Sequence, residues 1–260
     1  MASQSQTVIA VAGGTGGVGK SIVKVLSAGS EFKVIVLSRK VLLAPCLMIY
    51  TQTIANSKKA STSLRNVTLV SVDYQSVEAM ASMLESNNVH TVISALYDEA
   101  GAEQLKLIEA ARVSHCTQRF IASDWGVQFP PEAVRELPFV EWRFKAIDAL
   151  QGSGLEWTRV HNGYFLDYYG HSSNMTGPPF IVDVAARAAV IPGVGDEVLA
   201  LTHTHDVGRF VAALLSLPAG EWEEATFMYG ERVTWKDVIK TAEEITGKRT
   251  MCCKQPQCCC

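Results

Sequence analysis

The sequence has little charge and no long hydrophobic run. Charged residues make up 19% of its 260 residues, the formal net charge is −3, and no basic block is present, which argues against direct nucleic-acid binding. No apolar run approaches the ~20 residues that cross a bilayer, so we expect no membrane contact and a cytoplasmic protein. The 48% hydrophobic content suits one large α/β domain, or one with a small appended lobe.

The sequence also lacks a recognisable metal-ligand pattern. Five of its seven cysteines crowd residues 252–260, where no histidine is near and the spacing matches no familiar zinc site. We therefore expect an irregular, nonfunctional tail over 250–260, with S-acylation and adventitious disulfides as alternatives. Cys46 and Cys116 are isolated from the other cysteines, and we expect each to serve as a small core residue, as free cysteines commonly do. His203 and His205 have no acidic or cysteine partner at ligand spacing, so no metal site is predicted.

A glycine-rich turn follows the first apolar run. Gly13, Gly16 and Gly19 give the order G-x-x-G-x-x-G between the apolar run 7–12 and the amphipathic pattern 18–26. Such a turn lets the backbone approach a diphosphate and directs a helix N-terminus at it. We predict a dinucleotide site, with an ordinary glycine-rich loop as the alternative. The candidate cofactor contacts here are Gly13, Thr15, Gly16, Gly17, Val18 and Gly19.

The end of the second apolar run, 32–37, indicates which dinucleotide is bound. An acidic residue there would favour NAD, but the chain continues Ser38, Arg39, Lys40. A hydroxyl and two cations are suited to a 2′-phosphate. These residues favour NADP(H), with solvated loop charges as the alternative.

Alternating apolar and amphipathic segments predict the fold. Six strands are expected at 7–12, 32–37, 67–72, 91–95, 119–122 and 155–160, and helices at 18–26, 77–84, 102–112 and 139–150. This is the pattern of an α/β Rossmann fold with a doubly wound parallel sheet, here over residues 5–162. Ligands bind at the carboxyl ends of such strands. Further cofactor contacts are therefore expected among Asp73, Ser94, Ala95, Leu96, Ser123, Asp124, Asn162 and Phe165.

The regular alternation ends at Gly163, and we expect a small C-terminal substrate lobe over 163–249, interleaved with the core. Short apolar runs occur at 180–182, 189–191 and 198–201, and helices are predicted at 204–215, with Thr204 as N-cap and Asp206 in the first turn, and at 235–245. An aromatic set could form a flat wall for an aromatic substrate or pack in the core: Tyr164, Phe165, Tyr168 and Tyr169. The apolar segment 41–50 is an inserted strand, a partner surface or sequence foreign to the fold.

The chain resembles the fungal NmrA-like and isoflavone-reductase-like atypical short-chain dehydrogenases over about residues 5–249. The resemblance is carried by the glycine turn, Ser38-Arg39, and segments 119–126, 154–158, 162–165, 204–210 and 234–247. It implies a Rossmann domain with a smaller substrate lobe, which usually continues several tens of residues further, so the lobe is expected to be truncated. Members either reduce small, often aromatic, substrates with NADPH or bind NADP(H) and regulate a protein partner.

The tyrosine and lysine pair, four residues apart, that many short-chain dehydrogenases use for proton transfer is absent here. The resemblance instead implies a lysine on the helix before the sixth strand, for which Lys145 is the candidate. Counting back from Gly154 places that lysine nearer Arg143, and arginine cannot shuttle protons at neutral pH. Family analogy places Ser123 and Asp124 near the nicotinamide; a helix N-cap is their alternative.

His161 and Asn162 end the sixth strand, where they line a reacting centre or belong to the core. Taken together, the residues favour an NADPH-dependent reductase that transfers a hydride to a small aromatic or conjugated substrate. The alternative is a non-catalytic, NADP(H)-sensing regulator that acts through protein partners.

Overall fold

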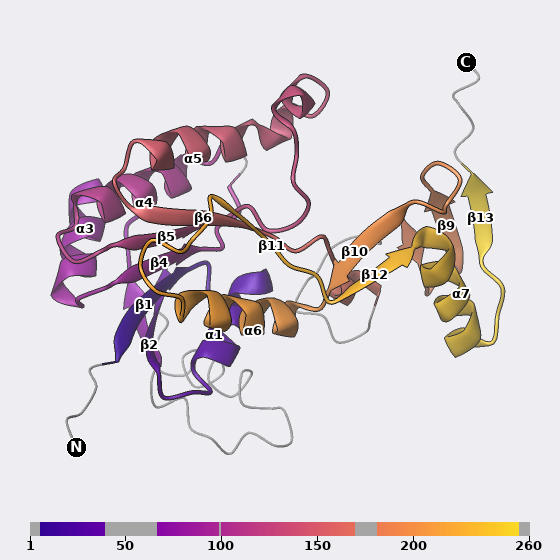
Figure 1. The fold of residues 1–260 in the computed structure, drawn as a ribbon, viewed down its shortest axis with the longest axis horizontal. Coiled ribbons are helices and arrows are strands. Elements are labelled where there is room, and N and C mark those ends of the chain that lie inside the picture. The colour runs from indigo at the N-terminus through magenta and orange to yellow at the C-terminus, as the bar shows by residue number, and fades with distance from the viewer. Residues whose placement is uncertain (1–5, 40–66, 99, 170–180, 255–260) are drawn as a thin grey trace.

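The computed structural model describes residues 6–39, 67–98, 100–169 and 181–254, and a parallel seven-stranded sheet is its centre (Figure 1). The strand order is β11-β6-β5-β4-β1-β2-β3, with every neighbouring pair parallel. The strands are β1 (Thr7–Ala12), β2 (Phe32–Ser38), β3 (Val67–Ser71), β4 (Thr91–Ser94), β5 (Arg119–Ala122), β6 (Glu156–His161) and β11 (Ala225–Phe227). The doubly wound Rossmann prediction is confirmed for the first six strands, and β11 was not predicted.

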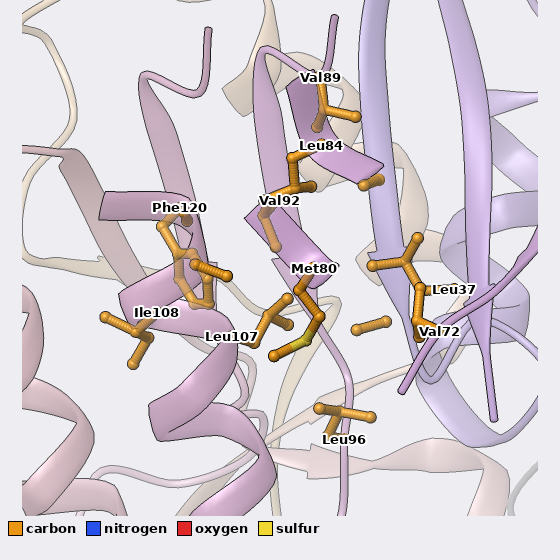
Figure 2. Close-up of a cluster of buried hydrophobic side chains, with 14 of the residues drawn as sticks. Leu37, Val72, Met80, Leu84, Val89, Val92, Leu96, Leu107, Ile108 and Phe120 are labelled. Atoms are coloured by element: carbon orange, nitrogen blue, oxygen red, sulfur yellow. The ribbon is translucent and has the colours of Figure 1, made fainter. Parts of the chain in front are cut away.

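Helices cover both faces of this sheet (Figure 1). One face carries α3 (Val77–Ser86), α4 (Ala102–Val113) and α5 (Glu141–Gln151), and the other carries α1 (Gly17–Leu26) and α6 (Thr204–Leu215). Figure 2 shows the first of the two cores, where Met80 of α3 and Leu107 of α4 lie among strand side chains such as Val92. Side chains alternate between the faces of a strand, so β1 directs Ala10 into this core and Ile9 into the other.

Among the described residues, the lobe contains two small sheets and the α-helix α7. One sheet has the order β12-β10-β7 and the other β13-β9-β8. Their strands are β7 (Tyr164–Phe165), β8 (Val182–Asp183), β9 (Ala188–Ile191), β10 (Val198–Thr202), β12 (Glu231–Thr234) and β13 (Met251–Lys254). Helix α7 (Trp235–Thr246) begins at a capping box in which Thr234 and Asp237 bond each other's backbone. A separate apolar core fills the lobe around Trp235, Leu199 and Ile191.

The chain passes repeatedly between the sheet and the lobe. After β10 it returns to the large sheet as α6, which packs on α1, and as β11, which pairs with β6; it then re-enters the lobe as β12. The division at residue 162 stays a prediction, but α6 and β11, which follow it in sequence, pack with the large sheet.

Two local predictions are wrong. The N-cap of α6 is His203, whose Nδ1 accepts a hydrogen bond from the His205 N–H, and Thr204 is the first helical residue. The tail is not irregular throughout, because Met251–Lys254 form β13 and pair in parallel with β9. The apolar segment 41–50, Lys40 and Cys46 lie outside the described residues. In the described part of the chain, every helix is too short or too polar to cross a membrane.

Candidate active site

The sheet brings most of the predicted cofactor residues to one edge. Because all its strands are parallel, their carboxyl ends meet there. Ser38 and Ser94 are the last residues of β2 and β4, and the other residues at this edge follow the strands β1 to β6: Gly13 to Gly19, Arg39, Asp73, Ala95, Leu96, Ser123, Asp124 and Asn162. Phe165 lies further on, in β7, where it is buried in the core between the sheet and α6.

The turn after β1 has a shape that side chains would prevent. Gly13 has φ +76°, and a Cβ there would overlap the carbonyl oxygen of Ala95 at the end of β4. A Cβ on Gly19 would overlap the carbonyl of Gly13. Gly16 is different, because no atom lies within 4 Å of where its Cβ would be. The turn is thus packed tightly against the sheet and leaves open space at Gly16.

Helix α1 begins at this open position. Gly16 is its N-cap, no side chain caps the helix, and its first turn contains no acidic residue. The first N–H groups of a helix have no partner within the helix and carry the positive end of its dipole. The start of α1 can therefore hold an anion such as a diphosphate.

Arg39 follows β2 and carries the only described cation of the predicted 2′-phosphate contacts. Its side chain is 68% exposed, and Nη1 lies 3.2 Å from Oε1 of Glu103 in the first turn of α4. Asp98 accepts hydrogen bonds from the backbone of that turn, chiefly from the Glu103 N–H, and these lower the pKa of its carboxyl below the usual value. Asp73 closes its own turn by accepting from the Gln75 N–H at 2.9 Å.

Hydrogen bonds fix the ends of β4 and β5 to each other. Ser123 Oγ donates to the Leu96 carbonyl at 2.7 Å, and Trp125 Nε1 donates to the Ser94 carbonyl at 2.9 Å. The Ser123 N–H donates to Gln104 of α4 at 2.7 Å, so Ser123 joins strands rather than capping a helix. Among the described residues, the buried hydroxyl of Ser94 has no partner.

A buried ion cluster lies beneath the ends of β5 and β6. Asp124, whose side chain is 7% exposed, is bonded to Arg143 of α5 and lies 3.5 Å from Nη1 of Arg159 on β6. The Arg143 guanidinium also lies over the rings of Trp142 and Phe129. These contacts hold Arg143 in place and make it a structural cation.

Lys145 is placed elsewhere on the same helix. Its side chain is 50% exposed, and Nζ lies 2.9 Å from Oε2 of Glu141, one turn earlier on α5. This is a surface pair, which contributes little to stability. The catalytic role of Lys145 stays a prediction that this geometry does not support.

A cavity of about 430 Å³ opens between the sheet edge and the lobe. We call it the lobe cavity. The sheet side provides loop residues after β5, the end of β6 and the segment after β11; the lobe provides β7, the start of β10 and α7. Its lining is Gly126, Val127, Gln128, His161, Gly163, Tyr164, Glu197, Val198, Leu199, Ala200, Phe227, Met228, Tyr229 and Trp235. The volume and the mostly apolar lining suit a small organic ligand.

The charged groups of the lobe cavity are few. Its lining, drawn from the described residues, contains no lysine or arginine, and Glu197 is its one carboxylate. The N–H of Gly195 donates to Glu197 at 2.9 Å and that of Val194 at 3.2 Å. With the N–H of Glu197 itself, which contributes most, these bonds lower the pKa of this carboxyl.

His161 is the buried polar group of the lobe cavity. It is 3% exposed, and neither ring nitrogen has a hydrogen-bond partner in the described structure. Its ring lies 5.2 Å from that of Phe227. Burial, more than any other influence, lowers its pKa below the usual 6.5; Arg159 and Arg143 lower it further, and Asp124 opposes them. The imidazole is therefore neutral at pH 7, and its hydrogen-bonding capacity is not used by any described residue. Neighbouring Asn162 is fully buried, and its Oδ1 also lacks a partner.

The aromatic wall differs from the predicted one. Of the predicted set only Tyr164 lines the lobe cavity; Phe165 and Tyr168 pack in the core beside α6, and Tyr169 packs in the lobe core. The other cavity aromatics are Phe227, Tyr229 and Trp235, which the sequence reasoning missed. They follow Gly163 by more than sixty residues, and only the pairing of β11 with β6 and of β12 with β10 brings them here.

A buried hydrogen-bond chain joins α1 to the junction with the lobe. Asp167, just after β7, accepts from both the N–H and the hydroxyl of Thr204 at 2.7 Å. Ser21 of α1 donates to the same hydroxyl at 2.9 Å. Thr204 therefore connects α1, α6 and the start of the lobe.

Comparison with known sequences identifies the family. The sequence model of the NmrA-like family matches residues 5–256. The chain belongs to the NmrA-like family. Oxidoreductase BOA1 from Botryotinia fuckeliana (strain B05.10) is 38% identical to this NmrA-like protein, over 93% of this chain and 76% of the relative. Oxidoreductase swnN from Metarhizium robertsii (strain ARSEF 23 / ATCC MYA-3075) is 30% identical over 93% and 74% of the two chains.

Solved structures share the fold of this NmrA-like protein. The complex of leucoanthocyanidin reductase with NADPH from Vitis vinifera has a TM-score of 0.73 and 16% identity, over 95% of this chain and 77% of the other. The structure of AtPrR2 with NADP⁺ and (+)pinoresinol also has a TM-score of 0.73, with 20% identity over 97% and 80%. At these sequence identities, the likeness shows a shared fold and nothing further.

Proposed function

We propose that this NmrA-like protein is an NADPH-dependent reductase that transfers a hydride to a small aromatic or conjugated substrate. The observation that carries the proposal is the lobe cavity, which opens at the same sheet edge as the glycine turn. A nucleotide on the turn and an organic molecule in the cavity would then meet at the ends of β4 to β6. Relatives named as oxidoreductases and fold neighbours solved with NADPH or NADP⁺ support this proposal.

The residues of the sheet edge fit NADP(H). The open space at Gly16 and the uncapped start of α1 suit the diphosphate, bound by the N–H groups of Gly17 and Val18. Arg39 would hold the 2′-phosphate, exchanging its exposed contact with Glu103 for a doubly charged group. When bound, NADPH supplies the hydride.

The chain's own part in the reaction is to position the substrate. Tyr164, Phe227 and Trp235 offer ring faces to a flat molecule, and aliphatic residues of the lining exclude water. Bringing two reactants together in a fixed orientation lowers the barrier by itself. No step requires Lys145, which lies on the surface of α5.

Calorimetric titration tests the cofactor proposal. We expect NADPH to bind more tightly than NADH, and Arg39→Ala to weaken NADPH binding by about 1.5–3 kcal/mol, as a lost charged hydrogen bond does. Arg112→Ala is the matched control, because Arg112 is also exposed and paired with a carboxylate but follows no strand. Equal affinity for both nucleotides, or an Arg39→Ala variant that binds NADPH as the wild type does, would contradict the assignment.

A turnover assay tests the reductase itself. NADPH oxidation is followed across a panel of aromatic ketones, aldehydes and enones with protein that is shown to bind the cofactor. Oxidation with members of the panel is the expected result. Normal NADPH binding with no oxidation across the panel would sink the catalytic proposal and leave the cofactor site standing.

The second candidate is an NADP(H)-sensing regulator without turnover. The lining of the lobe cavity, within the described structure, holds no lysine, and Arg143 is bonded to Asp124. The predicted lysine is thus missing from the described lining as a proton donor, and this observation motivates the regulator candidate. Partner capture that differs between NADP⁺ and NADPH would support this candidate, whereas capture indifferent to the two nucleotides would count against it.

A further inference from the structure

We propose that His161 determines substrate specificity by binding an uncharged oxygen atom of an aromatic substrate through a ring nitrogen. This inference rests on the reductase function proposed above, because it takes the lobe cavity as the substrate site. His161 lines that cavity, is 3% exposed and has both ring nitrogens without a partner among the described residues. Buried polar groups are normally hydrogen-bonded, so a residue in this condition points to a ligand that completes its bonding.

The surroundings of His161 favour an oxygen without full charge. The neutral imidazole can offer one N–H donor and one acceptor nitrogen, which match a carbonyl or a hydroxyl. A carboxylate would find no cation in the described lining and would share the cavity with ionised Glu197. The burial that keeps the imidazole neutral opposes any full charge at the same depth.

The ring contacts of the lobe cavity favour an aromatic body next to that oxygen. Phe227 lies 5.2 Å from the His161 ring, and Tyr164 lies 5.5 Å from Trp235 at 59° between the ring planes. Aromatic rings attract one another in offset or edge-to-face contacts at such distances, so a ring of the substrate can pack against these side chains. The cavity of about 430 Å³ holds such a molecule with its polar atom at His161.

The positive charges near His161 are balanced by a carboxylate. Arg143 and Arg159 are both paired with Asp124, and neither lines the lobe cavity. They act on the imidazole through space by opposing its protonation. His161 therefore remains the buried hydrogen-bonding side chain that the described lining offers to a ligand.

The test compares four small probes on the full chain saturated with NADP⁺, which supplies no hydride. Acetophenone carries a neutral oxygen, isopropylbenzene has nearly the same shape without it, and benzoate and benzylammonium carry opposite charges. Binding is measured by ligand-observed NMR titration. We expect wild-type protein to bind acetophenone about three- to tenfold more tightly than isopropylbenzene, as one hydrogen bond allows, and to bind both charged probes more weakly than acetophenone.

Three variants separate binding from structure. His161→Leu should abolish the difference between acetophenone and isopropylbenzene and leave the melting temperature equal or higher, because it removes two unpartnered buried nitrogens. His161→Gln keeps an N–H donor and should keep part of the difference, and it decides the matter if the leucine variant does not fold. His90→Leu is the control, since His90 is half-buried at the other end of β4 and bonds Thr91; it should bind the probes as wild type does.

The proposal is overturned if the acetophenone preference survives in folded His161→Leu. It is also overturned if wild-type protein prefers benzoate or benzylammonium, or binds none of the four probes. NADP⁺ titration of the same samples keeps the two proposals apart: a chain that does not bind NADP⁺ refutes the cofactor assignment, while the probe comparison on the nucleotide-free chain still decides the role of His161.

Discussion

The turn after β1 is built from backbone, whereas the lobe cavity is built from side chains. At the turn, the important features are a positive φ at Gly13, open space at Gly16 and the uncapped start of α1. In the lobe cavity, a histidine and four aromatic rings come from segments far apart in the chain. The difference teaches that the first site depends on glycines at fixed backbone positions, while the second can change its ligand through single side-chain replacements.

The largest effect is expected at the buried ion cluster of Asp124, Arg143 and Arg159. Asp124→Ala leaves Arg143 and Arg159 buried without their counter-charge, and should lower the free energy of unfolding by about 3–5 kcal/mol. Chemical denaturation measures this. Glu141→Ala, which breaks an exposed pair with Lys145, should change stability by no more than about 0.5 kcal/mol. Equal losses of unfolding free energy in the two variants would show that the buried cluster contributes no more to stability than the exposed pair.

The next effect separates two glycines of the same turn. Gly13→Ala places a methyl group against the Ala95 carbonyl at a positive φ, which should cost about 2–4 kcal/mol of stability. Gly16→Ala meets nothing in the protein and should stay within about 0.5 kcal/mol of the wild type.

The same two variants, Gly13→Ala and Gly16→Ala, also separate an effect on protein stability from an effect on NADPH binding. The methyl group of Gly16→Ala fills the space assigned to the diphosphate, so NADPH affinity should fall about tenfold or more, equivalent to about 1.4 kcal/mol. Denaturation and NADPH titration of both variants measure the contrast. A Gly16→Ala chain that binds NADPH normally would remove the diphosphate from this position.

A smaller effect compares two exposed phenylalanines. Phe227 and Phe139 are 65% and 66% exposed, but only Phe227 lines the lobe cavity. Phe227→Leu should weaken acetophenone binding about two- to tenfold through the lost ring contact, with little change in stability. Phe139→Leu should change neither quantity. NMR titration distinguishes them, and parallel losses in both variants would rule out a specific aromatic wall.

The smallest effect is a change in the pH dependence of stability. Burial lowers the pKa of His161 below 6.5, so the unfolded chain binds more protons there than the folded chain, and stability falls as pH drops below about 6.5. His161→Leu should make this fall shallower between that pH and the folded pKa. Denaturation at several pH values measures the slope, and an unchanged slope would mean that His161 titrates as it does in water.

A residual slope is expected in the His161→Leu variant. His90 also has a pKa that burial lowers, and its contribution has the same sign. The double variant His161→Leu, His90→Leu should flatten the curve further, which separates the two histidines.

The backbone site could be predicted from the sequence, because its signal is local. The glycine spacing, the apolar runs and the residues after each run lie within short segments, and they predicted six strands and one shared edge. The lobe cavity could not, because Phe227 and Trp235 come to Tyr164 and His161 only through strand pairing across tens of residues. The predicted aromatic set was adjacent in sequence, and most of it packs into cores instead.

The N-cap of α6 and the strand β13 are determined by tertiary contacts that outweigh the local sequence preference. Thr204 has a good N-cap side chain, yet its hydroxyl bonds Asp167 and Ser21, and His203 caps the helix. Residues 251–254 contain no strong strand pattern but pair with β9. The catalytic role of Lys145 stays a prediction, which its exposed pair with Glu141 does not support.

The return of α6 and β11 to the large sheet has a consequence for synthesis on the ribosome. Helix α6 covers the α1 side of the sheet through Val207 and Val211, and Trp222 adds to that core. Until these residues emerge, a nascent chain already holding β1 to β6 presents Ile9 and Val34 on an incompletely covered face. Such a face is prone to aggregation. The central sheet is thus completed only after β7 to β10 of the lobe have been made. Premature termination before residue 204 would give an aggregation-prone intermediate instead of an independently folded domain.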